Sequence, residues 1–268
     1  MVDANILMPA KVKLAWSNYH IDRLKYFWDR YCNSEFARLE VVEDDRGNGL
    51  FRLRLVVDQL PADVPLLAGD AIHAMRCALD YAINAVYPMD SKLTFPFRET
   101  RKELEGTFSS VGLEGCNSCG RGRTKGPYAK VEKASPGIAD IIIEKIRPYK
   151  DGNELLWVLN KLDVRDKHRL IVPAINIGEI TGINGRGRGI NMINCSIAVA
   201  AGNYLDSFPA TDDFILHSFD KPRAELILQE DNVIEDEPLF DTLFRMQNAV
   251  CDAIKFFEVH LNRTTLPS

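Results

Sequence analysis

Residues 66–87 read LLAGDAIHAMRCALDYAINAVY, and this stretch decides the fold. At about 100° per residue, its aliphatic residues fall on one face of a helix. The opposite face carries a contiguous arc of polar and titratable residues: Asp70, His73, Arg76, Cys77, Asp80, Tyr81 and Asn84. That arc contains neither lysine nor glutamate, the long side chains that a water-facing stripe normally carries. The pattern therefore predicts an amphipathic helix whose polar face lies in a packed polar interior, on a ligand or against a second subunit.

A second helix is predicted over residues 152–169, and it is apolar around most of its circumference. We expect it to lie near the centre of the protein, where polar residues are costly if they stay unpaired. Asn160, Asp163 and Lys167 share one stripe of this helix. They are expected to supply ligands to a metal site or, the alternative we favour, to pair with the charged residues of 66–87 in a buried network. Either way, the two helices should pack directly against each other.

The remaining pattern predicts a single α+β domain over residues 1–268, with helices first, then a mainly antiparallel sheet, then a closing helix. The helical motif region is 66–172, the strand-rich region is 169–230 and the closing helix is 238–262. Further helices are expected at 15–34, 98–108 and 135–148, a hairpin at 38–45 and 50–58, and strands at 170–177, 190–200, 212–219 and 223–231. The glycine-rich run 182–189 is expected to form a loose loop.

The composition narrows the class of protein. The net charge of −5 and the pI near 5.6 argue against wholesale binding of a polyanion, so RNA contacts would be confined to local basic segments such as 121–125 and 186–188. The chain has no run of about 18 apolar residues and no leader pattern. Its six cysteines lack the density of a secreted disulfide scaffold. We expect a cytoplasmic protein with reduced thiols, no membrane partner and no cofactor.

A single CxxC pair, Cys116 and Cys119, lies in a glycine-rich segment without a second pair or a nearby histidine. That pattern is weak for zinc, so we expect the segment to be metal-free. His73 lies three residues after Asp70 and could form half of a metal site, but a histidine on a packed polar face is more often a hydrogen-bonded structural residue. No metal site is predicted.

Two motifs carry a resemblance to known proteins. Residues 75–81 read MRCALDY and residues 156–170 read LWVLNKLDVRDKHRL, with Phe95-Pro96 between them and Pro148-Tyr149 before the second. This arrangement resembles a family of uncharacterised bacterial and phage proteins that read L-R-S-A-L-D-H-L and L-W-x-L-x-x-L-D-N-x-D-K-H-R. The resemblance covers about residues 66–172 and implies no established activity.

The first motif is also similar to the R-x(4–6)-H signature of HEPN ribonucleases, helical proteins that cut RNA at a composite site between two subunits. That similarity implies a HEPN-like bundle and a metal-independent endoribonuclease. The chain departs from the signature, because five residues after Arg76 stands Tyr81 and not histidine. Metal-independent cleavage needs a base and an acid or cation, and tyrosine, with a reference pKa of about 10, is a poor base at neutral pH. The missing imidazole would have to come from His73 or His168.

Two hypotheses follow. In the first, the chain is a structural or interaction protein, in which Arg76 and Asp80 form an i,i+4 ion pair and the two helices make a polar core or the seam of a homodimer. In the second, it binds or cuts RNA in the HEPN manner. The catalytic candidates are then Arg76, Asp80, Tyr81, His73 and His168, with Lys167 and Arg169 binding phosphate. A closed network between the helices favours the first hypothesis, and an open cleft shared by Arg76 and His168 favours the second.

Overall fold

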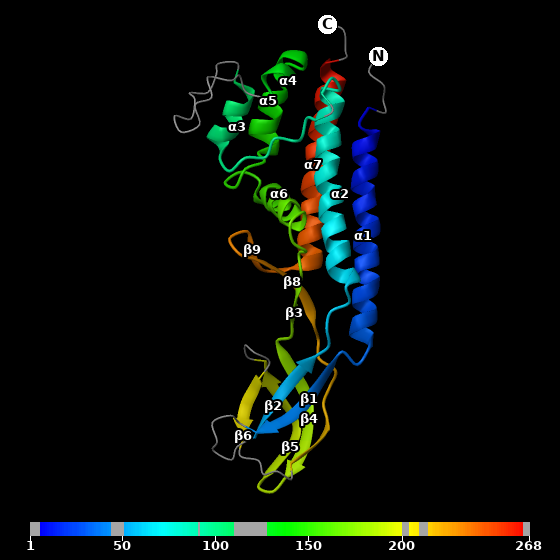
Figure 1. Cartoon of the computed structure of the whole chain (residues 1–268), viewed down its shortest axis with the longest axis vertical. Coiled ribbons are helices and arrows are strands. Elements are labelled where there is room, and N and C mark those ends of the chain that lie inside the picture. Colours follow the sequence, from blue (N-terminus) through cyan, green and yellow to red (C-terminus); the bar gives the residue numbers. More distant parts are fainter. Residues whose placement is uncertain are drawn as a thin grey trace. The chain divides into compact units, whose positions relative to one another are not determined.

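The computed structural model describes residues 6–43, 51–90, 92–109, 128–199, 204–208 and 214–264. The helices are α1 (Met8–Asn33), α2 (Asp63–Val86), α3 (Arg101–Phe108), α4 (Ala129–Ala134), α5 (Ile138–Asp140), which continues into a π-helical turn (Ile141–Ile146), α6 (Glu154–Asp166) and α7 (Leu239–Thr264). The strands are β1 (Ala37–Glu43), β2 (Phe51–Val57), β3 (Ala174–Asn176), β4 (Glu179–Gly187), β5 (Ile190–Ala198), β6 (Tyr204–Phe208), β7 (Ile215–Ser218), β8 (Glu225–Glu230) and β9 (Ile234–Pro238). The α+β class, the N-terminal hairpin and the closing C-terminal helix are confirmed (Figure 1).

The residues group into two compact units, and the single domain predicted from the sequence stays a prediction. The helical unit contains Met1–Arg23, Pro65–Val172 and Glu230–Ser268, and the strand unit contains Leu24–Val64 and Pro173–Gln229. Each unit is therefore assembled from stretches that are far apart in the chain. The CxxC pair and the basic segment 121–125 lie outside the described residues, so the prediction made for them stays a prediction.

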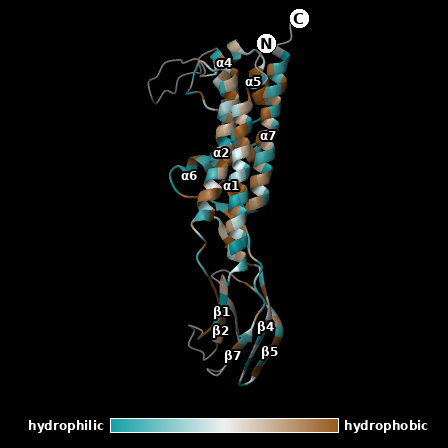
Figure 2. Ribbon diagram, turned by 90° about the vertical axis from the view of Figure 1, so that its right-hand side faces the viewer, coloured by the Kyte–Doolittle hydropathy of each residue, from teal (hydrophilic) through white to brown (hydrophobic). Residues whose placement is uncertain are grey.

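The helical unit is built on the apolar faces of its long helices. α2 and α7 are long helices, and hydrophobic and hydrophilic residues alternate along both of them (Figure 2). The predicted aliphatic face of α2 is buried, as are the matching positions of α7: Ile72, Met75, Leu79 and Ile83 on α2, and Leu243, Met246, Val250, Ile254 and Phe257 on α7. Burying an aliphatic side chain of this size contributes about 1.5–3 kcal/mol, so these faces hold the helices in place. No helix among the described residues is long and apolar enough to cross a membrane.

The strand unit consists of small antiparallel sheets. β1 pairs with β2 from Ala37↔Val57 to Glu43↔Phe51, and β6 joins the other edge of β2. β4 lies between β5 and β7 in a second sheet, and β3 pairs with β8. In β2, the side chains of Leu53 and Leu55 are buried while the intervening Arg54 contacts Glu40 on β1. The period-two pattern therefore matches the burial of alternate residues along the hairpin.

The loop predicted at 182–189 is wrong, because most of this run is strand β4. A Cβ atom at Gly185 would lie 2.5 Å from the Phe214 ring, and one at Gly187 would lie 2.9 Å from the Phe214 backbone. These glycines leave room for an aromatic residue against the strand, which the sequence pattern cannot distinguish from a turn. Gly189, with φ of +85°, does serve a turn, the short one between the paired ends of β4 and β5.

Candidate functional site: a polar network between α2 and α6

The predicted direct packing of α2 and α6 is confirmed by hydrogen bonds between them. The side chain of Asn153 caps α6 by accepting a hydrogen bond from the Leu156 backbone at 3.2 Å. Near the other end of α6, a Cβ atom at Gly69 of α2 would lie 2.6 Å from Asp166 Oδ2. The helices therefore approach closely because glycine stands at this position. Their polar stripes meet in two groups, which we call the Arg76 cluster and the His73 cluster.

The Arg76 cluster consists of Arg76, Asp80, Asn160, Phe95 and Phe97. The Arg76 residue is only 9 % exposed. Its guanidinium forms an ion pair with Asp80 one turn along α2, and its Nε donates a hydrogen bond to Asn160 Oδ1 on α6 at 3.1 Å. Its Cζ lies 4.5 Å from the centre of the Phe97 ring. The Asp80 carboxylate also accepts a hydrogen bond from the Phe95 backbone at 2.6 Å, so the pair is enclosed by groups of the same chain.

The extended segment that contains Phe95 is anchored on α2 by further polar contacts. Asn84 Nδ2 donates to the carbonyl oxygens of Asp80 and Leu93, each at 2.8 Å. The hydroxyl of Tyr128 donates to the carbonyl oxygen of Thr94, and burial raises the pKa of this tyrosine. The Phe95-Pro96 element of the sequence motif thus closes one side of the Arg76 cluster.

The His73 cluster consists of His73, Cys77, Asp163 and Lys167. His73 Nδ1 lies 2.7 Å from Asp163 Oδ1, and His73 Nε2 lies 3.3 Å from Cys77 Sγ. Asp163 is only 2 % exposed, and its second carboxylate oxygen accepts a hydrogen bond from Lys167 Nζ at 2.6 Å. The side chain of His73 is 49 % exposed. Unlike the Arg76 cluster, this group is therefore open to solvent on one side.

The structure separates the remaining predicted site residues from the Arg76 cluster. Tyr81 is exposed on α2, and the exposed His168 ring forms no hydrogen bond with the described part of the chain. Arg169, a predicted phosphate ligand, forms an ion pair with the buried carboxylate of Glu230. Lys167, the second predicted phosphate ligand, forms an ion pair with Asp163. Both predicted phosphate-binding cations are thus engaged by carboxylates of the chain.

The Asp70 carboxylate of α2 lies beside His20 of α1. Asp70 Oδ2 lies 3.8 Å from His20 Nδ1, and burial lowers the pKa of His20. Among the described residues, no three His, Cys, Asp or Glu side chains form a cluster suited to a metal ion.

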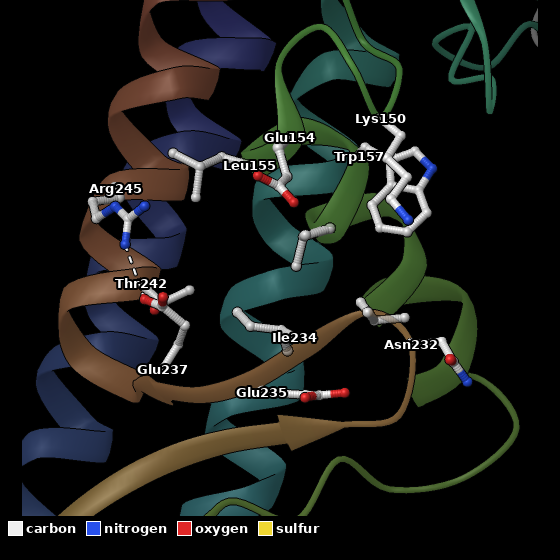
Figure 3. A pocket seen from close by; sticks show the side chains of 12 residues that line it. Lys150, Glu154, Leu155, Trp157, Asn232, Ile234, Glu235, Glu237, Thr242 and Arg245 are labelled. Atoms are coloured by element: carbon white, nitrogen blue, oxygen red, sulfur yellow. Dashed lines mark hydrogen bonds and ion pairs between the residues drawn. The ribbon is translucent and has the colours of Figure 1, made fainter.

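A pocket of about 380 Å³ that sequence reasoning missed lies between α6, β9 and the start of α7 (Figure 3). Trp157 and Glu154 line it from α6, and Glu235 lines it from β9. Arg245 of α7 forms an ion pair with Glu237 of β9 at 3.0 Å. In the sequence, the acidic residues before the closing helix are the only signal that could have indicated this pocket. None of the predicted site residues lines the pocket.

Comparison with models of protein families, with curated proteins and with solved structures found no match. The resemblance of the two helical motifs to bacterial and phage proteins, and to HEPN ribonucleases, therefore stays a prediction.

Proposed function

We propose that this chain is a structural and interaction protein in which the Arg76 cluster of the α2–α6 network is an internal polar core. One observation carries the proposal: the guanidinium of Arg76 is nearly buried and finds Asp80, Asn160 and the Phe97 ring within its own chain. A charge held in this way contributes to a single packing arrangement, and removing its partner is strongly destabilising. The network needs no second subunit to complete it, so we propose a core and not a dimer seam at this place.

The surface that we propose for interaction is an apolar stripe on α1. Met8, Val12, Trp16 and Tyr19 are each about half exposed. At 100° per residue they fall within an arc of about 80°. The rings of Trp16 and Tyr19 stack, with their centres 4.8 Å apart and an interplanar angle of 15°. Contiguous exposed apolar surface of this kind is typical of a site for another protein surface.

The partner that we propose is a second copy of the chain. In an antiparallel two-fold pairing centred between Trp16 and Tyr19, each tryptophan faces the tyrosine of the other copy. Such a self-complementary contact is what a two-fold homodimer requires. The aromatic pair supplies rigid, apolar contact area, with the more aliphatic Met8 and Val12 beside it.

The alternative, a metal-independent endoribonuclease, finds less support. Lys167 and Arg169 are paired with carboxylates, and Arg76 is directed at groups of its own chain. Tyr81 stands where the HEPN signature has histidine, and tyrosine is a poor base at neutral pH.

Sedimentation velocity of the full chain tests the interaction proposal. The parent should sediment as a dimer, and the double variant Trp16→Ser/Tyr19→Ser should sediment as a monomer with unchanged circular dichroism. Phe244→Ser, which removes an equally exposed aromatic residue from α7, is the control and should stay dimeric. A monomeric parent, or a dimer that survives the double variant, contradicts the α1 interface.

An RNA assay tests the alternative. The parent protein, incubated with structured and unstructured RNAs in the presence of EDTA, should leave them intact. Cleavage by the parent that Arg76→Met abolishes without a loss of stability would replace the structural proposal with the endoribonuclease.

A further inference from the structure

The His73 cluster has the arrangement of a nucleophile, a base and an orienting carboxylate. Cys77 Sγ lies 3.3 Å from His73 Nε2, and His73 Nδ1 lies 2.7 Å from Asp163 Oδ1. A nucleophile within hydrogen-bond reach of a base that a third group orients is the geometry of covalent catalysis by thiols and hydroxyls. Helical spacing alone places His73 beside Cys77, but Asp163 comes from α6. The third member is therefore a product of the tertiary fold.

Asp163 determines which ring nitrogen of His73 carries the proton. Its carboxylate is buried, and one oxygen is occupied by Lys167 Nζ. The other oxygen accepts the Nδ1 proton of His73, which leaves the lone pair of Nε2 directed at the thiol of Cys77. His73 is half exposed and Cys77 is partly exposed, so this side of the cluster faces solvent.

The thiol needs this base. Burial raises the pKa of Cys77, the carboxylates of Asp80 and Asp163 add to the rise, and the cations of Lys13 and Arg76 oppose it. The sulfur is thus protonated at neutral pH, and the nucleophile forms only as the proton passes to His73.

The other cysteines of the described residues lack such a base. Cys77 is the one cysteine there whose sulfur has a histidine nitrogen within hydrogen-bond distance; Cys32, Cys195 and Cys251 do not. They serve as internal controls for thiol reactivity.

We propose that Cys77 is the nucleophile of an acyl-acceptor site, with His73 as its general base and Asp163 as the residue that positions the imidazole. The substrate class is a small activated acyl ester or thioester. Tyr81 is exposed one turn after Cys77 and offers an aromatic surface on which a short acyl group can lie beside the sulfur. The site uses the open side of α2 and depends neither on the α1 interface nor on RNA.

In the proposed step, the Cys77 S–H proton moves to His73 Nε2 while the sulfur electron pair forms a bond to the carbonyl carbon. The tetrahedral adduct then collapses, the bond to the leaving oxygen or sulfur breaks, and the leaving group takes the proton back from Nε2. The products are S-acyl Cys77 and the free alcohol or thiol, so atoms and charge balance without any other reactant.

The test uses the full chain and p-nitrophenyl acetate as the acyl donor. Release of p-nitrophenolate gives the rate, and peptide mass mapping gives the residue that carries the acetyl group. The parent should acetylate Cys77 faster than Cys32, Cys195 or Cys251, and more slowly in D2O than in H2O because a proton moves in the step. Removal of a general base typically costs 10²- to 10⁴-fold, so His73→Gln should slow acetylation of Cys77 by at least about 100-fold and abolish the D2O effect.

His217→Gln is the matched control, because it removes an exposed histidine of β7 that belongs to neither cluster, and it should react as the parent does. Asp163→Asn should slow acetylation of Cys77 while leaving Cys251 unaffected, which a merely structural role would not do. If Asp163→Asn fails to fold, His73→Gln still tests the proposal, because it replaces a half-exposed side chain. Acetylation of Cys77 at the parental rate in His73→Gln, or no preference for Cys77 in the parent, overturns the proposal.

Discussion

Replacing Arg76 with methionine tests the structural role of the α2–α6 network most strongly. Methionine keeps much of the side-chain volume beside the Phe97 ring but removes the charge that faces Asp80 and the donor that faces Asn160. The Asp80 carboxylate then keeps only the Phe95 backbone donor in its enclosed position.

The expected loss follows from this geometry. Breaking a buried pair by removing one partner costs about 3–5 kcal/mol. The Asp80 side chain is 28 % exposed, so water can restore part of its solvation, and we expect a loss at the low end, about 3 kcal/mol. A typical domain is stable by about 5–15 kcal/mol, so the loss is a large fraction of the total. It corresponds to a fall in Tm of about 6–12 °C for a chain of this size.

Urea unfolding followed by circular dichroism measures this loss directly. Arg101→Met is the matched control, because Arg101 is half exposed and its pairs with Glu105 and Glu144 lie on the surface. Exposed pairs of this kind contribute about 0–1 kcal/mol, so the control should change little. If Arg76→Met unfolds at the same urea concentration as Arg101→Met, the reasoning about a buried network is refuted.

Two further predictions concern other parts of the molecule. Gly187→Ala should destabilise the strand unit by about 1–3 kcal/mol, because the added Cβ would lie 2.9 Å from the Phe214 backbone. Gly178→Ala is the control and should be nearly neutral, because nothing lies within 4 Å of an added Cβ there. Equal urea midpoints for the two variants would contradict this packing. Burial lowers the pKa of His260, whose Nε2 lies 2.7 Å from Ser135 Oγ, so the unfolded chain binds this proton more readily than the folded one. The free energy of unfolding should therefore fall as the pH drops below about 6.5, the reference pKa of histidine. The His260→Gln variant should show a smaller difference between its urea midpoints at pH 7.5 and 5.5 than the parent does. An unchanged pH dependence in that variant would show that His260 is not the group responsible.

Helical periodicity predicted the parts of the site that depend on one helix. The alternation of aliphatic and polar residues over 66–87 placed Ile72 and Met75 in the core, and i,i+4 spacing placed Arg76 beside Asp80. Both follow from the geometry of a single helix, which the sequence specifies locally.

The partners across the two helices could not be assigned in the same way. Pairing of α6 with the charges of α2 was predicted, but Asp163 binds His73, and Asn160 is the residue that reaches Arg76. This choice depends on how far one helix slides along the other. The close approach at Gly69 occurs at one particular register, and no local pattern encodes that register.

The glycine-rich run of β4 was wrongly predicted to be a loop for a related reason. A run of glycines is typical of a loop, but here it makes room for Phe214, which lies well away in the sequence. The pocket lined by Trp157 and Glu235 likewise combines stretches that only the tertiary fold brings together. Local patterns do not record such long-range contacts.

A double-mutant cycle between Arg76 and Asn160 tests the central claim, that the Arg76 cluster between α2 and α6 is a closed polar core within the chain. Free energies of unfolding are measured for the parent, Arg76→Met, Asn160→Ala and the double variant. A hydrogen bond to a charged group is worth about 1.5–3 kcal/mol, so the two substitutions should be less than additive by at least about 1 kcal/mol. Additive effects, within about 0.3–0.5 kcal/mol, would show that the two side chains do not interact and would contradict the closed network.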